Sequence, residues 1–94
     1  MQIKLEKLLE ELQRVADPEK EKVYRRFFKT GKGDYGEGDK FLGISVPKLR
    51  EISKKYQELD FKDLQKLLES KIHEHRMSAL MILRFKYEKT LRLP

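Results

Sequence analysis

Residues 27–51 read FFKTGKGDYGEGDKFLGISVPKLRE and contain all five glycines of the chain. Glycine is the residue that most readily takes a positive φ and lets two backbones approach closely. Because the remaining sequence shows helical spacing of its apolar residues, we expect one loop here, flanked by helices. Ser45 and Pro47 fit the N-cap and the first turn of the following helix, and Lys48 and Arg50 come directly after them. Exposed N–H groups beside cations favour an anion site; the alternative is that the glycines only shape the backbone.

Helical periodicity extends over the rest of the chain. In the N-terminal segment, Leu5, Leu8 and Leu12 recur at the spacing of one helix face. No segment alternates apolar and polar residues as a half-buried strand does. We therefore predict an all-α fold with five helices, at residues 2–16, 18–29, 46–56, 61–69 and 71–89. Short amphipathic helices with short links are typical of stacked helical hairpins, which predicts HEAT-like repeats (an α-α superhelix) in a single domain over 1–94.

The predicted fifth helix is apolar around almost its whole circumference. A helix of this kind expects neighbours on several sides. The four preceding short helices cannot cover all of its large apolar side chains, which include Leu80, Met81, Leu83 and Phe85. We expect the chain to be the N-terminal part of a longer array, or to form a homo-oligomer through this last helix. The alternative is a five-helix bundle with this helix at its centre.

Composition sets the class of partner. The 94 residues include 22 Lys or Arg and 16 Asp or Glu, so the net charge is +6. That excess favours polyanions, with nucleic acid first and an acidic membrane surface second, although both signs of charge are mixed along the chain. The absence of cysteine excludes disulfide and thiol chemistry. No apolar run approaches the roughly 20 residues of a membrane span, and no signal peptide is recognisable, so we expect a cytoplasmic location.

The most specific motif of the chain is Phe-Leu-Gly-Ile-x-x-Pro-x-x-Arg, which lies within residues 41–50. Together with several other segments, it resembles one known family, the AlkD-like DNA alkylation-repair proteins. The resemblance extends from Asp17 to Tyr87 and covers less than half of a typical member. The other segments that carry it are Tyr24-Arg25-Arg26-Phe27-Phe28-Lys29-Thr30-Gly31, Tyr35-Gly36-Glu37-Gly38-Asp39, Ile72-His73-Glu74-His75-Arg76 and Ala79-Leu80-Met81-Ile82-Leu83.

The resemblance implies an array of HEAT-like repeats that binds duplex DNA in a basic concave groove. Active members of the family hydrolyse the N-glycosidic bond of cationic alkylated purines. Their Trp-Asp catalytic element lies further along the array, and this chain has no tryptophan. The resemblance therefore implies the fold and part of a DNA groove, but assigns no catalytic residue here. It also implies a lesion-facing aromatic position at Phe27 and a basic position at Lys29.

The candidate DNA-binding residues combine cations in or after the glycine-rich segment with one aromatic side chain. They are Phe27, Lys29, Lys32, Lys40, Lys48, Arg50 and Lys54. For Phe27 the alternative is a place in the core. Among the basic residues at this helix, Lys55 is a further candidate, and Glu51 weakens the local field. The competing interpretation of the whole chain is a non-catalytic helical-repeat scaffold that binds a protein partner.

Other motifs favour structural roles. The glycine-rich segment lacks the Gly-Lys-Ser/Thr of a phosphate-binding loop, and no strand precedes it. In His73-Glu74-His75 the two histidines point to different sides of a helix, whereas a zinc helix needs ligands four residues apart. Contacts and capping near Ser70 are the expected role of this run. We expect no metal and no cofactor.

Overall fold

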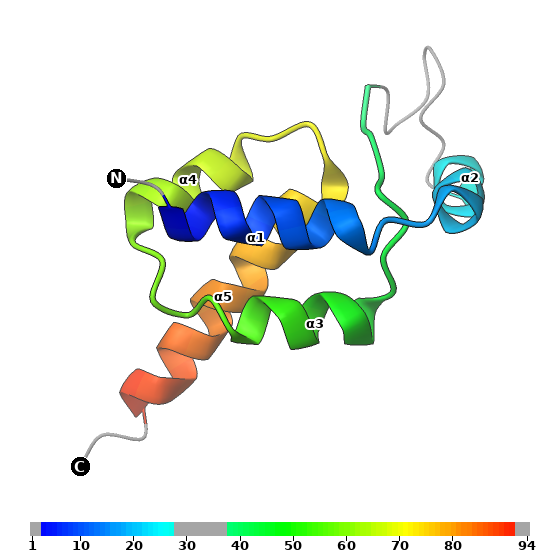
Figure 1. The fold of residues 1–94 in the computed structure, drawn as a ribbon. Coiled ribbons are helices and arrows are strands. Elements are labelled where there is room, and N and C mark those ends of the chain that lie inside the picture. Colours follow the sequence, from blue (N-terminus) through cyan, green and yellow to red (C-terminus); the bar gives the residue numbers. More distant parts are fainter. Residues whose placement is uncertain (1–2, 28–37, 92–94) are drawn as a thin grey trace.

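The computed structural model describes residues 3–27 and 38–91, and they form five α-helices (Figure 1). The helices are α1 (Ile3–Arg14), α2 (Pro18–Phe27), α3 (Val46–Lys54), α4 (Phe61–Leu68) and α5 (His73–Leu91). The all-α prediction is confirmed, since the described residues contain no strand and only one isolated bridge, between Lys40 and Ile72. The fifth helix begins and ends two residues later than predicted.

The core lies between α1, α3, α4 and α5. In Figure 1, α1 and α3 run across the molecule and α5 crosses them diagonally. Both α3 and α4 pack against α5, and α1 packs against α3. Each helix contributes leucine or isoleucine at helical spacing, because that spacing places them on one face. The largest fully buried apolar side chains among the described residues are Leu8, Leu12, Ile52, Leu59, Leu64 and Ile82.

The contact between α3 and α5 contains one buried polar pair. The hydroxyl groups of Ser53 and Ser78 lie 2.7 Å apart, and both residues are fully buried. A buried hydroxyl without a partner would destabilise the fold, so each serine satisfies the other. Small side chains at this point also let the two helices approach closely.

Helix α2 stands apart from this core and contains no buried residue. Its start is fixed instead by hydrogen bonds. Asp17 caps the helix, accepting the N–H of Glu19 at 2.9 Å through its side chain and that of Glu21 at 2.9 Å through its carbonyl oxygen. Asp60 caps α4 in the same way, with the Asp63 N–H at 2.9 Å. Both positions were predicted from sequence.

Ser45 is the N-cap of α3, but its side chain makes no capping hydrogen bond. Its predicted place at the N-cap is confirmed, although its hydroxyl takes no part in the capping. Its carbonyl oxygen accepts the Leu49 N–H at 2.9 Å, and Pro47 stands in the first turn as expected. The backbone that precedes Ser45 is held by other groups, described below.

Candidate nucleic-acid interface

Residues 38–45, here called the strap, directly precede α3 in the chain. In space the strap lies between the start of α2 and the start of α5. The Glu74 side chain, 1 % exposed, lies against the strap. Its two carboxylate oxygens accept the backbone N–H groups of Leu42 at 2.8 Å, Gly43 at 3.0 Å and Ile44 at 3.3 Å. Three hydrogen bonds offset the cost of burying this carboxylate. These three amides are therefore occupied by Glu74, so phosphate contact stays a prediction for the other amides of the glycine-rich segment, most of which lie outside the described residues.

Gly43 is the point of closest approach between the strap and α2. Its φ is +82°, and a Cβ atom there would lie 2.2 Å from the carbonyl oxygen of Asp17 and 2.6 Å from the backbone nitrogen of Glu21. The next residue back takes part in the same contact, because the Leu42 carbonyl oxygen accepts the Asp17 N–H at 2.9 Å. Only glycine fits this position, which fixes the strap against the first turn of α2.

The other end of the strap is joined to the segment before α5. The backbone of Lys40 donates to the Lys71 carbonyl at 3.0 Å and accepts from the His73 N–H at 2.8 Å. Beside it, the Arg76 guanidinium pairs with the Asp39 carboxylate at 2.9 Å. The Lys40 side chain is left exposed. The backbone that carries this cation is thus hydrogen-bonded, through both its N–H and its carbonyl group, to the segment before α5.

The two histidines next to Glu74 have structural partners. The His73 ring lies 5.0 Å from the Phe41 ring, and Ser70 Oγ lies 2.9 Å from His75 Nδ1. Burial lowers the pKa of both histidines from its ordinary value. Within residues 3–27 and 38–91, no three His, Cys, Asp or Glu side chains are grouped as a metal site would need. Their contacts agree with the role near Ser70 expected from sequence.

The basic residues of α3 fall on two different stripes. Arg50 and Lys54 are four residues apart, so they share one exposed face of the helix. Among the described residues, neither side chain makes an ion pair. Lys48 lies further round the helix, where it pairs with Glu51 at 3.6 Å, and Lys55 pairs with Glu11 of α1. The two cations most available to a phosphate are therefore Arg50 and Lys54.

The exposed face of α3 continues onto α5 through a shallow hollow. Its volume is about 310 Å³, and it is lined by Arg50, Met81, Arg84, Phe85 and Glu88. The Arg84 side chain is 79 % exposed and donates to the Glu88 carboxylate at 2.9 Å. Arg84 thus places a third cation beside the Arg50 stripe. Sequence reasoning missed it, because the apolar residues of the helix dominated the pattern.

Of the remaining predicted residues, Phe27 is the last residue of α2. The Phe27 side chain is 76 % exposed, so it is not part of the core. Lys29 and Lys32 lie outside the described residues. A cavity of about 140 Å³ lies between α2, α3 and α5, and Tyr24, Val46 and Met77 are among the side chains that line it.

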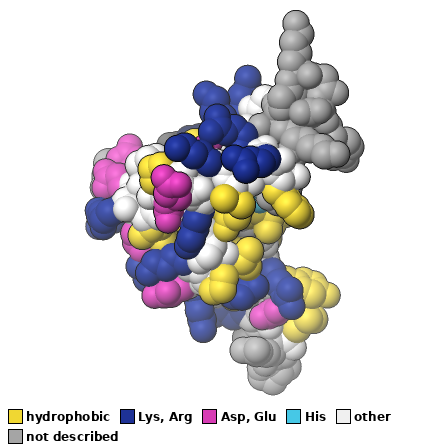
Figure 2. Space-filling model, turned by 90° about the vertical axis from the view of Figure 1, so that its right-hand side faces the viewer, with side chains coloured by type: hydrophobic (Ala, Val, Ile, Leu, Met, Phe, Trp, Pro, Cys, Tyr) yellow, Lys and Arg dark blue, Asp and Glu magenta, His cyan; other side chains and the backbone are white. Residues whose placement is uncertain are grey.

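Basic and apolar side chains share one side of the molecule. Figure 2 shows the side that carries α2 and the strap in Figure 1. Lys and Arg side chains gather along the upper part of the described surface, with hydrophobic side chains below them. Three exposed hydrophobic side chains, Val23, Phe27 and Val46, belong to α2 and the start of α3. Charge for phosphates and apolar surface for sugars or bases are therefore available together.

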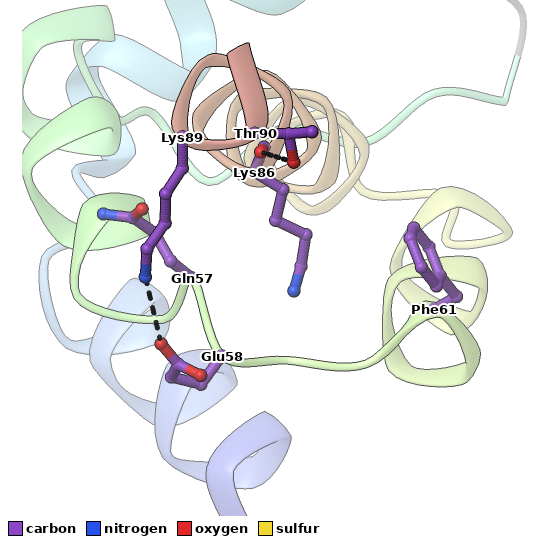
Figure 3. Close-up of a pocket in the computed structure, with 6 residues that line it drawn as sticks. All are labelled: Gln57, Glu58, Phe61, Lys86, Lys89 and Thr90. Carbon is purple, nitrogen blue, oxygen red and sulfur yellow. Dashed lines mark hydrogen bonds and ion pairs between the residues drawn. The ribbon is translucent and has the colours of Figure 1, made fainter. Parts of the chain in front are cut away.

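A second hollow lies between the start of α4 and the end of α5 (Figure 3). Its volume is about 360 Å³, and two of its lining residues are cations. Lys89 reaches toward Glu58, with 3.9 Å between Nζ and Oε1, and Lys86 Nζ lies 5.8 Å from the centre of the Phe61 ring. Both cations thus have partners. This hollow is a weaker candidate for phosphate than the Arg50 stripe.

Comparison with known proteins points to one family. A family model described as DNA alkylation repair enzyme matches residues 8–93. Curated proteins and solved structures give no match. None of the helices in the described part of the chain is both long and apolar enough to cross a membrane.

Proposed function

Because the chain belongs to the DNA alkylation repair enzyme family, whose fold is HEAT-like, we propose that it binds duplex DNA without sequence preference, through the phosphate backbone. In this role it is the DNA-binding N-terminal portion of a protein that excises cationic alkylated purines. The net charge of +6 supports a polyanionic partner. Phosphate contacts hold and position a duplex without selecting its sequence.

The observation that carries this proposal is the pair formed by Arg50 and Lys54. Both side chains are exposed on one face of α3, and within the described chain neither is neutralised by a carboxylate. The opposite face of α3 is buried through Leu49 and Ile52, so the helix has a fixed orientation. The cations are therefore presented by a rigid element. Arg84 from α5 lies beside them, but its charge is paired with the Glu88 carboxylate at 2.9 Å, so the proposal does not depend on it.

The proposal limits this chain to binding. Cleavage of a cationic alkylpurine needs a carboxylate that stabilises positive charge on the sugar and positions water. The family's Trp-Asp element is missing from the sequence. Glu74, the buried carboxylate near the interface, already accepts three backbone hydrogen bonds. We expect no release of 7-methylguanine from duplex DNA above the rate without protein, measured as free base.

Binding is tested by fluorescence anisotropy of a labelled duplex at a series of salt concentrations. For Arg50→Glu/Lys54→Glu we expect the dissociation constant to rise by roughly tenfold or more, with a shallower dependence on salt, because fewer phosphates are neutralised. The lost contacts are with phosphates, which every duplex carries, so binding to all duplex sequences should weaken alike.

The matched control is Lys62→Glu/Lys66→Glu. These two lysines are also four residues apart and exposed, but they lie on α4. The control makes the same change in net charge on another helix, so it should weaken binding much less. Equal weakening by both double variants would show that only net charge matters. Binding that is indifferent to salt would exclude a phosphate-based interface.

A further inference from the structure

A small cavity lies next to α2, between that helix, the start of α3 and α5. Its volume is about 140 Å³, and most of its wall is apolar, with side chains from Ile44, Val46, Leu49 and Met77. An apolar cavity of about 150 Å³ is large enough to hold a benzene molecule. Water would find few hydrogen-bonding partners on such a wall. The cavity therefore suits one compact organic group of about the size of a benzene ring.

Part of the cavity wall is aromatic. Tyr24 of α2 and His73 of α5 line the cavity, and the Phe41 ring packs against both, with its centre 6.3 Å from that of Tyr24 and 5.0 Å from that of His73. Burial lowers the pKa of His73 from its ordinary value, so this ring is neutral at neutral pH. Neutral aromatic rings attract cations, and quaternary ammonium groups are the ligands that aromatic sites of this kind recognise.

The remaining wall residue is the buried Glu74. Its carboxylate accepts N–H groups of the strap, and no Lys or Arg within residues 3–27 and 38–91 pairs with it. These N–H groups and the start of α5 supply only partial positive charges. Buried charges in proteins are normally paired with a full opposite charge. The cavity wall thus carries a negative charge for which the described part of the chain provides no counter-ion.

We propose that this cavity binds a quaternary ammonium group, such as the trimethylammonium head of choline. Such a group is about as large as a benzene ring, so it fits the volume. It brings the positive charge that faces Glu74, while its methyl groups contact the apolar and aromatic walls. It also has no N–H donors. A primary ammonium or a guanidinium would need acceptors, and the Glu74 oxygens are already occupied by the strap.

The ammonium site involves α2 but does not require DNA. Helix α2 contains no buried residue, and it contributes Tyr24 to the cavity. A bound ammonium group would add a contact between this helix and the core. We therefore expect saturation with choline to slow the hydrogen exchange of the α2 amides, because a ligand stabilises the state that it binds. Exchange in α2 that is unchanged by bound choline would contradict a site in this cavity.

The direct test is a titration of the full chain with choline chloride, which replaces sodium chloride at constant ionic strength, followed by NMR of the methionine methyl groups. Met77 lines the cavity, whereas Met81 lines the hollow beside Arg50 and serves as an internal control. We expect the Met77 signal to shift and the Met81 signal to stay, with a dissociation constant of about 1 mM or lower. The neutral analogue of choline, with a tert-butyl group in place of trimethylammonium, should bind roughly tenfold more weakly, because it has the shape without the charge.

Two variants test the charged and aromatic walls, with circular dichroism as the check that they remain helical. Glu74→Gln should abolish the preference for choline over its neutral analogue. Tyr24→Leu, at a half-buried position, should reduce that preference roughly threefold. Tyr87→Leu is the control, because it makes the same change at an exposed position of α5 outside the cavity lining.

Three results would overturn the proposal. They are equal affinity of the natural chain for choline and its analogue, a Met81 shift as large as that of Met77, and a preference that Tyr24→Leu and Tyr87→Leu change alike. The first two use the natural chain, so they apply even where Glu74→Gln does not fold. None of these outcomes bears on whether Arg50 and Lys54 bind DNA.

Discussion

Two glutamates join distant parts of this molecule in different ways. Glu74 is 1 % exposed and accepts only backbone N–H groups, from three successive residues of the strap. The Glu11 side chain is 21 % exposed and accepts from the side chains of Lys55 and Tyr56. The first fixes the path of the main chain between α2 and α5. The second ties α1 to the end of α3 without constraining any backbone.

The two contacts also differ in which groups lose a partner when the contact is removed. Without the Glu74 carboxylate, three donors in a buried place lose their acceptor, and unsatisfied buried donors are strongly destabilising. Without the Tyr56 hydroxyl, the Glu11 carboxylate can turn to Lys55 or to water. We therefore expect the fold to lose far more stability when a contact to backbone N–H groups is removed than when a contact between side chains is removed. Three substitutions test this contrast, in decreasing order of effect.

Gly43→Ala should have the largest effect. Its Cβ would lie 2.2 Å from the Asp17 carbonyl oxygen, and the φ of +82° disfavours any residue with a Cβ. We expect a loss on the order of 3 kcal/mol or more in the free energy of unfolding, measured with denaturant. Gly38→Ala is the control, because its φ is +86° but nothing lies within 4 Å of the added atom. It should cost only about 1 kcal/mol. Equal losses would mean that φ alone matters.

Glu74→Gln should have an intermediate effect. The amide keeps the shape but replaces one acceptor oxygen by an NH₂ group, which faces backbone donors. We expect a loss of about 2 kcal/mol in the free energy of unfolding, since hydrogen bonds to a charged acceptor are the stronger ones. The control is Glu69→Gln, which removes the same charge from an exposed position. A Glu74 variant as stable as this control would show that the carboxylate does not hold the strap.

Tyr56→Phe should have the smallest effect, about 1 kcal/mol at neutral pH. Burial and the hydrogen bond to Glu11 raise the pKa of Tyr56 from 10.0 to about 12. The folded state thus holds the phenolic proton to higher pH than the unfolded state does. This contribution to stability is complete below pH 10 and is lost as the pH rises toward about 12.

The pH dependence is measured as the difference in unfolding free energy between the natural chain and Tyr56→Phe. That difference should shrink across this alkaline range, because the variant has no such proton to lose. Near-ultraviolet titration should show one tyrosine that ionises late in the natural chain and is missing from the variant. A difference that stays constant with pH would contradict the role of the Glu11 hydrogen bond.

Helix positions were predictable because they depend on local signals. Leucine spacing, Asp17 before Pro18 and Asp60 before α4 each act within one turn of chain. The strap was not predictable in the same way. Its amides are bound by Glu74, which lies about 30 residues later in the sequence, and a buried glutamate runs against the usual preference of charged side chains for solvent. Three amides at the end of the glycine-rich segment are occupied by Glu74, a partner that no local sequence pattern indicates.

In the candidate interface, too, some positions follow from local sequence spacing and others depend on how the helices pack. The spacing of Arg50 and Lys54 already placed them on one helix face, and 100° per residue would also have separated Lys48 from them. That Arg84 lies beside Arg50 depends on how α3 packs against α5, which no local pattern contains. Four apolar side chains of α5 were expected to exceed what the preceding helices could cover. Leu80 is 51 % exposed, whereas Met81, Leu83 and Phe85 are half-buried.

The anchoring of the strap has a consequence for hydrogen exchange. Residues 42–44 belong to no helix or strand, so their amide hydrogens would ordinarily exchange quickly with solvent. Here those hydrogens point at a buried carboxylate, and Gly43 is closed off by the first turn of α2. They can exchange only when α2, the strap and α5 separate. These three amides should therefore report the opening of the whole domain, as amides of a core helix do.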